Sequence, residues 1–75
     1  MAKEIIFLNL ESEMLKARVN KAELAAMIDI SAGSMSSKFT GKTEFNLDEM
    51  LLIKERLESL TDQEFTLDYL FSKEA

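Results

Sequence analysis

The segment 20–42 constrains the fold more than any other part of this 75-residue chain. It contains two positions where an apolar residue precedes a capping residue and another apolar residue follows four positions after the cap. The pairs are Val19 with Leu24 around Asn20, and Ile30 with Met35 around Ser31. Such hydrophobic staples set the angle at which the chain enters a helix. The sequence therefore predicts two short helices, at 21–28 and 32–40, joined by a three-residue turn.

Polar residues and a glycine support the same two helices. Asn20 is a preferred N-cap, and Glu23 at the third helical position completes a capping box. Gly41 follows the second helix as a C-terminal stop. Two stapled helices separated by a tight turn form a helix-turn-helix unit, whose second helix is the one offered to the DNA major groove.

Three further helices are predicted. Leu10, Met14 and Ala17 recur at the spacing of one helix face, so a helix is expected at about 9–18. A longer helix begins after Asn46. Its predicted buried face consists of Leu47, Met50, Ile53 and Leu57. A last short helix is expected at 67–71.

Capping patterns mark the starts of the later helices. Asn46 with Glu49 reads as a capping box, Thr61 with Glu64 reads as another, and Thr66 starts the last helix. We accordingly predict a turn near Thr61 before the final helix. The expected fold is an all-α, compact bundle of about five short helices with the helix-turn-helix at the second and third, in a single domain spanning 1–75.

An apolar arm, residues 1–8, precedes the first helix. Its run Ile5–Leu8 fits no helix stripe, so we expect an irregular or helical packed arm, with a short strand as the alternative. The run is too short for a signal-peptide core or a membrane span, and we predict a cytoplasmic protein without a membrane partner.

Composition argues against several kinds of site. The chain has no Cys and no His, so it offers no disulfide and no thiolate, and neither a metal site nor a cofactor is expected. Paired acidic residues lie at helix starts, where the helix dipole explains them. A catalytic Ser34–Lys38 pair would need a cleft and a desolvated lysine, whereas we expect Lys38 to be exposed. We therefore predict that the protein is not an enzyme.

Charge is distributed unevenly along the chain, whose formal net charge is −5. Residues 18–43 contain four basic and two acidic side chains, whereas residues 44–75 contain three basic and nine acidic ones. Phosphate attraction depends on charge within a Debye length of about 8–10 Å, so a distant acidic surface weakens DNA binding without preventing it. The acidic C-terminal part also leaves open a role in binding a basic protein partner.

The sequence LAAMIDISAGSMSSKFTGK at 24–42 resembles the Cro- and repressor-type (lambda-repressor-like) helix-turn-helix proteins of phages and bacteria. The positions that match the family pattern are Leu24, Ala25, Ile28, Ile30, Ser31, Met35, Phe39, Gly41 and Lys42. Two positions depart from it, because Asp29 stands where the family usually has Gly and Thr40 where it often has Asn. A left-handed conformation at Asp29 would cost more than at Gly, although Asp tolerates it better than most residues.

The resemblance implies a DNA-binding surface on and around the 32–40 helix. Ala32, Gly33 and Ser37 match base-contacting positions, and the lysines, Thr40 and Thr43 are candidate phosphate contacts. The complete candidate set is Asn20, Lys21, Ser31, Ala32, Gly33, Ser34, Ser36, Ser37, Lys38, Thr40, Lys42 and Thr43. None of them forms a bidentate Arg–guanine or Gln/Asn–adenine pair, so we expect modest direct readout helped by DNA shape. The competing interpretation of the serines is a solvated helix face of small residues.

The resemblance also implies a function. We expect a small phage-type, Cro-like transcriptional regulator that binds a double-stranded operator as a homodimer and represses by occlusion. The candidate dimer interface is the apolar run Met50–Ile53, shared with Ile5–Leu8 or Tyr69–Phe71. The alternative is an acidic protein–protein interaction module, such as an anti-repressor or assembly factor, with the same fold.

Overall fold

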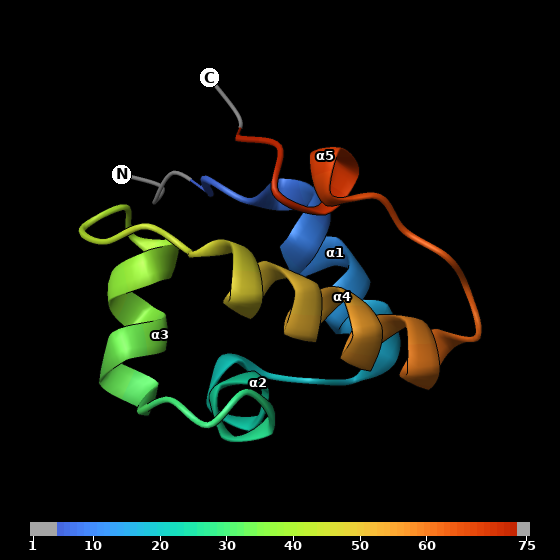
Figure 1. Ribbon diagram of the computed structural model, residues 1–75, viewed down its shortest axis with the longest axis horizontal. Coiled ribbons are helices and arrows are strands. Elements are labelled where there is room, and N and C mark those ends of the chain that lie inside the picture. Colours follow the sequence, from blue (N-terminus) through green and yellow to red (C-terminus); the bar gives the residue numbers. More distant parts are fainter. Residues whose placement is uncertain (1–4, 74–75) are drawn as a thin grey trace.

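The computed structural model describes residues 5–73 and shows a helical bundle, with no strand in that range. The helices are α1 (Leu8–Ala17), α2 (Lys21–Met27), α3 (Ala32–Phe39), α4 (Leu47–Thr61) and α5 (Leu67–Leu70). In Figure 1, α4 crosses the molecule in front of α1, while α3 stands at the left end, α2 lies at the bottom and α5 lies at the top. The described part of the chain contains no helix that is long and apolar enough to cross a membrane.

The predicted caps of α2 and α4 are confirmed as reciprocal hydrogen bonds. The amide of Glu23 donates to Asn20 Oδ1 over 2.7 Å, and the Asn20 amide donates to Glu23 Oε1 over 2.9 Å. Asn46 and Glu49 repeat the arrangement at 2.8 and 3.0 Å. Because a capping box satisfies backbone donors that a helix start leaves free, these two boundaries follow from residues three positions apart.

The predicted capping box at Thr61 is wrong. Thr61 is the last residue of α4, and its hydroxyl donates to the carbonyl oxygen of Leu57 over 2.7 Å. The chain leaves the helix at Asp62, in the left-handed conformation with φ 55°. Glu58 Oε2 then accepts the Phe65 amide over 2.8 Å, which fastens the following loop to α4. The loop 62–66 runs in Figure 1 from the end of α4 to α5.

The buried face of α4 is confirmed in its middle but not at its start. Ile53 and Leu57 are fully buried, and Met50 packs against the core. Leu47, which was expected to be buried, is 57% exposed. The reason is Phe45, which precedes α4 and fills the core at this end instead.

The N-terminal arm packs irregularly, as expected, and the strand alternative is wrong for residues 5–8. Phe7 is buried against the rings of Phe39, Phe45 and Phe71, with centroids 6.1, 5.4 and 6.2 Å away. Ile6 approaches Gly41, where an added Cβ would lie 3.1 Å from Ile6 Cδ1. Residues 1–4 of the predicted arm lie outside the described residues.

A short turn connects α2 to α3. The amide of Ile30 donates to the carbonyl oxygen of Ala25 over 3.0 Å, which ends α2. Asp29 has φ 63°, so the left-handed conformation expected at this position is present. In Figure 1, α2 is viewed nearly along its axis while α3 runs across the view, so the two helices are steeply inclined.

Candidate nucleic-acid interface

Helix α3 lies on the surface with one side anchored in the core. Met35 and Phe39 are 0% and 5% exposed, as predicted from their spacing on one face. The other side is exposed and small. Its exposed residues are Ala32, Gly33, Ser34 and Ser36. Helix α3 contains no acidic residue, so its outer face is an uncharged surface of small residues that another molecule can approach closely.

The hydroxyl groups at the ends of α3 serve the helix itself. Ser31 Oγ accepts the amide of Ser34 over 3.0 Å and donates to Ser34 Oγ over 3.0 Å. Thr40 Oγ1 donates to the carbonyl oxygen of Ser37 over 3.1 Å. Ser31 is thus a helix cap as well as a candidate contact. Ser36 lies in the middle of the exposed face and is the hydroxyl best placed to meet a ligand.

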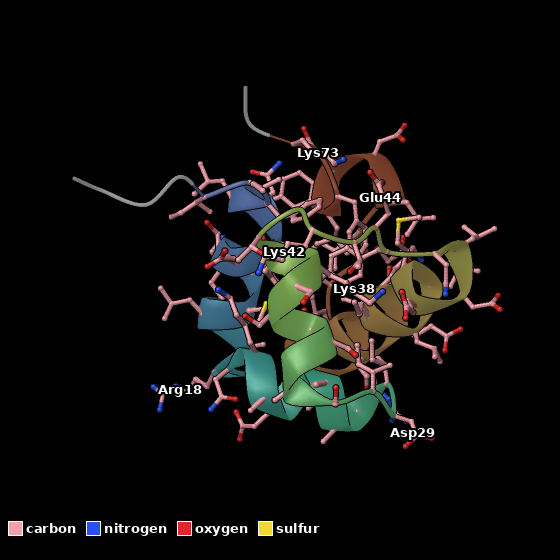
Figure 2. The ribbon with its side chains drawn as sticks, turned by 90° about the vertical axis from the view of Figure 1, so that its left-hand side faces the viewer. Arg18, Asp29, Lys38, Lys42, Glu44 and Lys73 are labelled. Carbon is pink, nitrogen blue, oxygen red and sulfur yellow. The ribbon has the colours of Figure 1, made fainter. Side chains whose placement is uncertain are left out.

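The expectation that Lys38 is exposed is wrong, because its side chain is only 12% exposed. Lys38 Nζ lies 3.0 Å from Glu49 Oε1 and donates to the carbonyl oxygen of Glu44 over 3.1 Å. It also lies 5.8 Å from the ring centroid of Phe45. Figure 2 shows Lys38 on the side of α3 that faces α4. Its charge is therefore used to hold α3 against the start of α4.

Glu49 is correspondingly held in its charged form. Burial by itself raises the pKa of Glu49. The hydrogen bond from the Asn46 amide and the charge of the Lys38 ammonium group together outweigh this effect, so the pKa of Glu49 lies below its ordinary value. A single carboxylate oxygen of Glu49, Oε1, accepts the Asn46 amide and also contacts the Lys38 ammonium group. Lys38 is thereby neutralised locally and is a weak candidate for binding phosphate.

Lys21 is placed beside the second half of α3. Its ammonium nitrogen lies 4.7 Å from the ring centroid of Phe39 and 3.7 Å from Glu11 Oε2. A surface hollow between the arm and α3 is lined by Lys21 together with Ser36 and Thr40. The structure thus brings three of the candidate residues together, although Glu11 offsets part of the lysine charge.

Two other basic side chains have no acidic partner in residues 5–73. Lys42 is exposed in the loop after α3, next to exposed Thr43. Arg18, which was not among the site residues expected from the sequence, is exposed at the end of α1 with φ 60°. Figure 2 places Lys42 at the C-terminal end of α3, whereas the end of α1, which carries Arg18, lies well away from α3 in Figure 1.

Asn20 remains bound in its capping box, and Ser37 is half-buried on the flank of α3. In residues 5–73 no group of three or more acidic side chains is placed to hold a metal ion. Comparison of the chain with protein-family models, with curated proteins and with solved structures finds no match.

Proposed function

We propose that this protein is a sequence-specific, DNA-binding transcriptional regulator that inserts α3 into the major groove of an operator. The observation that carries the proposal is the outer face of α3, which is exposed, composed of small residues and free of acidic side chains. Helix α2, the left-handed turn residue Asp29 and α3 follow one another as in a helix-turn-helix unit. The sequence resemblance to Cro- and repressor-type proteins supports the same proposal.

The proposed contacts divide into base-reading and phosphate-binding residues. Ala32, Gly33 and Ser36 approach base edges, where a Ser hydroxyl pairs with several bases and an Ala methyl packs on thymine. Lys42 flanks the C-terminal end of the helix and binds phosphate. Lys38 leaves the phosphate set, because Glu49 neutralises it. With few base-specific groups, part of the specificity comes from DNA shape.

The regulator is proposed to act in the cytoplasm as a homodimer with one α3 in each of two successive major grooves. Occupation of the operator then blocks polymerase or a competing repressor. Such a dimer presents two copies of each phosphate contact, which makes its affinity strongly dependent on salt.

A titration of operator and scrambled duplexes at two salt concentrations tests this proposal. The variant Ser36→Glu places a carboxylate on the exposed face of α3 and is expected to weaken specific binding by at least about ten-fold, because the carboxylate repels DNA. Ser59→Glu introduces the same charge on an exposed residue of α4 and serves as the matched control. Equal binding by both variants would contradict the proposed role of α3.

The salt dependence separates phosphate-binding lysines from structural ones. Lys42→Ala is expected to weaken all duplexes about equally and to reduce the slope of log Kd against log salt by about 0.9 for each phosphate that the side chain neutralised. Arg56→Ala removes the same charge from the second half of α4, which extends away from α3 in Figure 1. An unchanged slope for Lys42→Ala would remove Lys42 from the interface.

A second candidate function rests on the acidic C-terminal segment. Residues 57–72 contain four acidic side chains and no basic one. An acidic surface of this kind favours a basic protein partner, so the same domain is also a candidate protein–protein interaction module.

A further inference from the structure

A buried carboxyl group lies between α1 and α5, far from the outer face of α3. Glu13 is only 4% exposed and belongs to the face of α1 that also carries Leu10 and Met14. Its Oε2 accepts the hydroxyl of Tyr69 over 2.7 Å. Within residues 5–73, its other oxygen, Oε1, is enclosed and has no hydrogen-bond partner. A buried carboxylate oxygen without a donor is costly, so a ligand donor that reached Oε1 after a small opening of the site would stabilise the group.

Glu13 is the most deeply buried residue lining a surface cavity of about 360 Å³. The other residues that line it are Gln63, Glu64, Phe65, Thr66 and Tyr69. They come from the loop that connects α4 to α5 and from α5 itself. The cavity therefore has a carboxylate at its base and a second carboxylate, Glu64, on its exposed edge.

Two of the six residues that line the cavity are aromatic. The rings of Phe65 and Tyr69 are stacked with centroids 6.2 Å apart and an interplanar angle of 12°. Tyr69 is 40% exposed, so part of its ring is open to a ligand. Ring faces attract cations, and planar cations stack on them in addition.

The charge around the cavity is mostly negative. The segment 57–72 contains four acidic residues and no basic one; Glu64 among them lines the cavity, and Glu58 is paired with Lys54 of α4. The only basic group at Glu13 in the described residues is Lys16, whose Nζ lies 3.5 Å from Oε2 while its side chain stays 66% exposed. Since that ion pair is 3.5 Å long and its lysine end is exposed to solvent, a better-placed cation can displace it.

We propose that this cavity binds the guanidinium group of an arginine side chain carried by a partner protein. A guanidinium group is planar and presents several N–H donors in a fixed fork, which fits two carboxylates beside an aromatic wall. The inference rests on the second candidate function, the binding of a basic protein partner, and identifies an arginine side chain as the group that is bound. It is independent of DNA binding.

The test is an NMR titration of the ¹⁵N-labelled full chain with N-acetyl-arginine amide. Saturable shifts are expected for the amides of Phe65, Thr66 and Tyr69, and the neutral analogue N-acetyl-citrulline amide is expected to produce none. Glu64→Gln and Glu13→Gln are each expected to weaken binding by about ten-fold, since each removes a charge-assisted contact. Glu55→Gln, on the exposed surface of α4, is the matched control.

Two variants keep the test independent of folding. Glu13→Gln changes a buried group, whereas Glu64→Gln alters an exposed one and is expected to leave the fold intact. The proposal is overturned by absent shifts, by equal shifts with the citrulline analogue, or by equal affinity in wild type, Glu64→Gln and Glu13→Gln. Binding of free arginine without binding of the blocked amide would also overturn it, because the ligand would then be the free amino acid.

A ten-residue polylysine peptide separates this inference from the second candidate function. One possible result is that polylysine binds equally to the wild type and to Glu13→Gln while the arginine amide does not bind. This result would overturn the arginine site but would be consistent with an acidic docking surface. Failure of both ligands would contradict the inference and the second candidate together.

Discussion

At the scale of single residues, the helix ends depend on backbone conformations that L-residues adopt at a cost. Arg18, Asp29 and Asp62 have φ values of 60°, 63° and 55°, and each follows the end of a helix. Gly41 does so with φ 86° after α3. A left-handed residue costs an ordinary side chain about 1–2 kcal/mol, and Asp somewhat less than most. The turn between α2 and α3 is therefore built with some strain at Asp29.

Replacing Asp29 by glycine relieves this strain. We expect Asp29→Gly to raise the free energy of unfolding by about 0.5 kcal/mol, because the relieved steric cost slightly exceeds the greater chain entropy of glycine. Urea denaturation monitored by circular dichroism measures the change. Asp29→Ala is the control and should be less stable than Asp29→Gly. The opposite order would show that the left-handed conformation is not required in solution.

At the scale of elements, one ion pair joins α3 to the start of α4. Glu49 Oε1 receives both the amide that completes the α4 capping box and the Lys38 ammonium group. Both side chains are less than 15% exposed, so solvent screens them weakly. The position of α3, and with it the proposed DNA-binding face, thus depends on the ionisation of Glu49.

This dependence predicts loss of stability in acid. The pKa of Glu49 is lowered in the folded protein, so its contribution is complete above the unfolded value of 4.5 and disappears as the pH falls through the folded pKa. The same sign holds for Glu58, whose pKa is lowered by the Phe65 amide and by Lys54. We expect the free energy of unfolding of the wild type to decrease as the pH falls below 4.5.

Glu49→Gln tests the assignment. The variant keeps an oxygen for the capping box but cannot ionise, so its stability should be lower than wild type at pH 7 and should change less between pH 5 and pH 3. Denaturant titrations at several pH values measure both. Glu55→Gln serves as the exposed control, and a pH dependence for Glu49→Gln as steep as wild type would contradict the role of this ion pair.

At the scale of the whole molecule, a cluster of phenylalanines joins distant parts of the chain. Phe7 from the arm, Phe39 from α3, Phe45 from the loop and Phe71 after α5 contact one another edge to face at 5.2–6.2 Å. A chain of this length has a total stability of about 4–11 kcal/mol. A loss of about 3 kcal/mol from this cluster would therefore be a large fraction of the total stability.

Truncating the arm residue of this cluster should come close to unfolding the protein. We expect Phe7→Ala to lower the free energy of unfolding by about 3–5 kcal/mol, because it opens a cavity among three rings. Phe7→Leu, which refills most of the volume, should cost much less. Thermal denaturation of the two variants gives the comparison. Similar melting temperatures for Phe7→Ala and wild type would show that the arm is not part of the folded core.

The proposed homodimer predicts a contact at the outer face of α4. Leu51 and Leu52 are 41% and 40% exposed there, beside partly buried Met50. Leu51→Glu is expected to raise the dimer dissociation constant by at least about ten-fold, as truncation of a central apolar contact does. Sedimentation equilibrium measures it. Leu15→Glu, a change at a 79% exposed leucine of α1, is the control, and dissociation by that variant alone would move the interface to α1.

The sequence by itself determined the elements whose causes lie within a few residues. The capping boxes at Asn20 and Asn46 and the shared buried face of Met35 and Phe39 follow from spacings of three or four positions, and α3 ends two residues before Gly41. Such local hydrogen bonds and face periodicity are largely independent of the rest of the fold.

Only the tertiary structure decided which side chains meet across the bundle. Lys38 is paired because α4 brings Glu49 to it, and Glu13 is buried because α5 brings Tyr69, 56 residues away, to its carboxyl group. Glu13 shares the face of Leu10 and Met14, so its spacing indicates burial, but no spacing indicates its partner. These contacts depend on how helices pack, and many arrangements of the same amphipathic helices bury their apolar faces equally well. Consequently, the charged side chains available to a ligand are those that have no partner within the packed bundle.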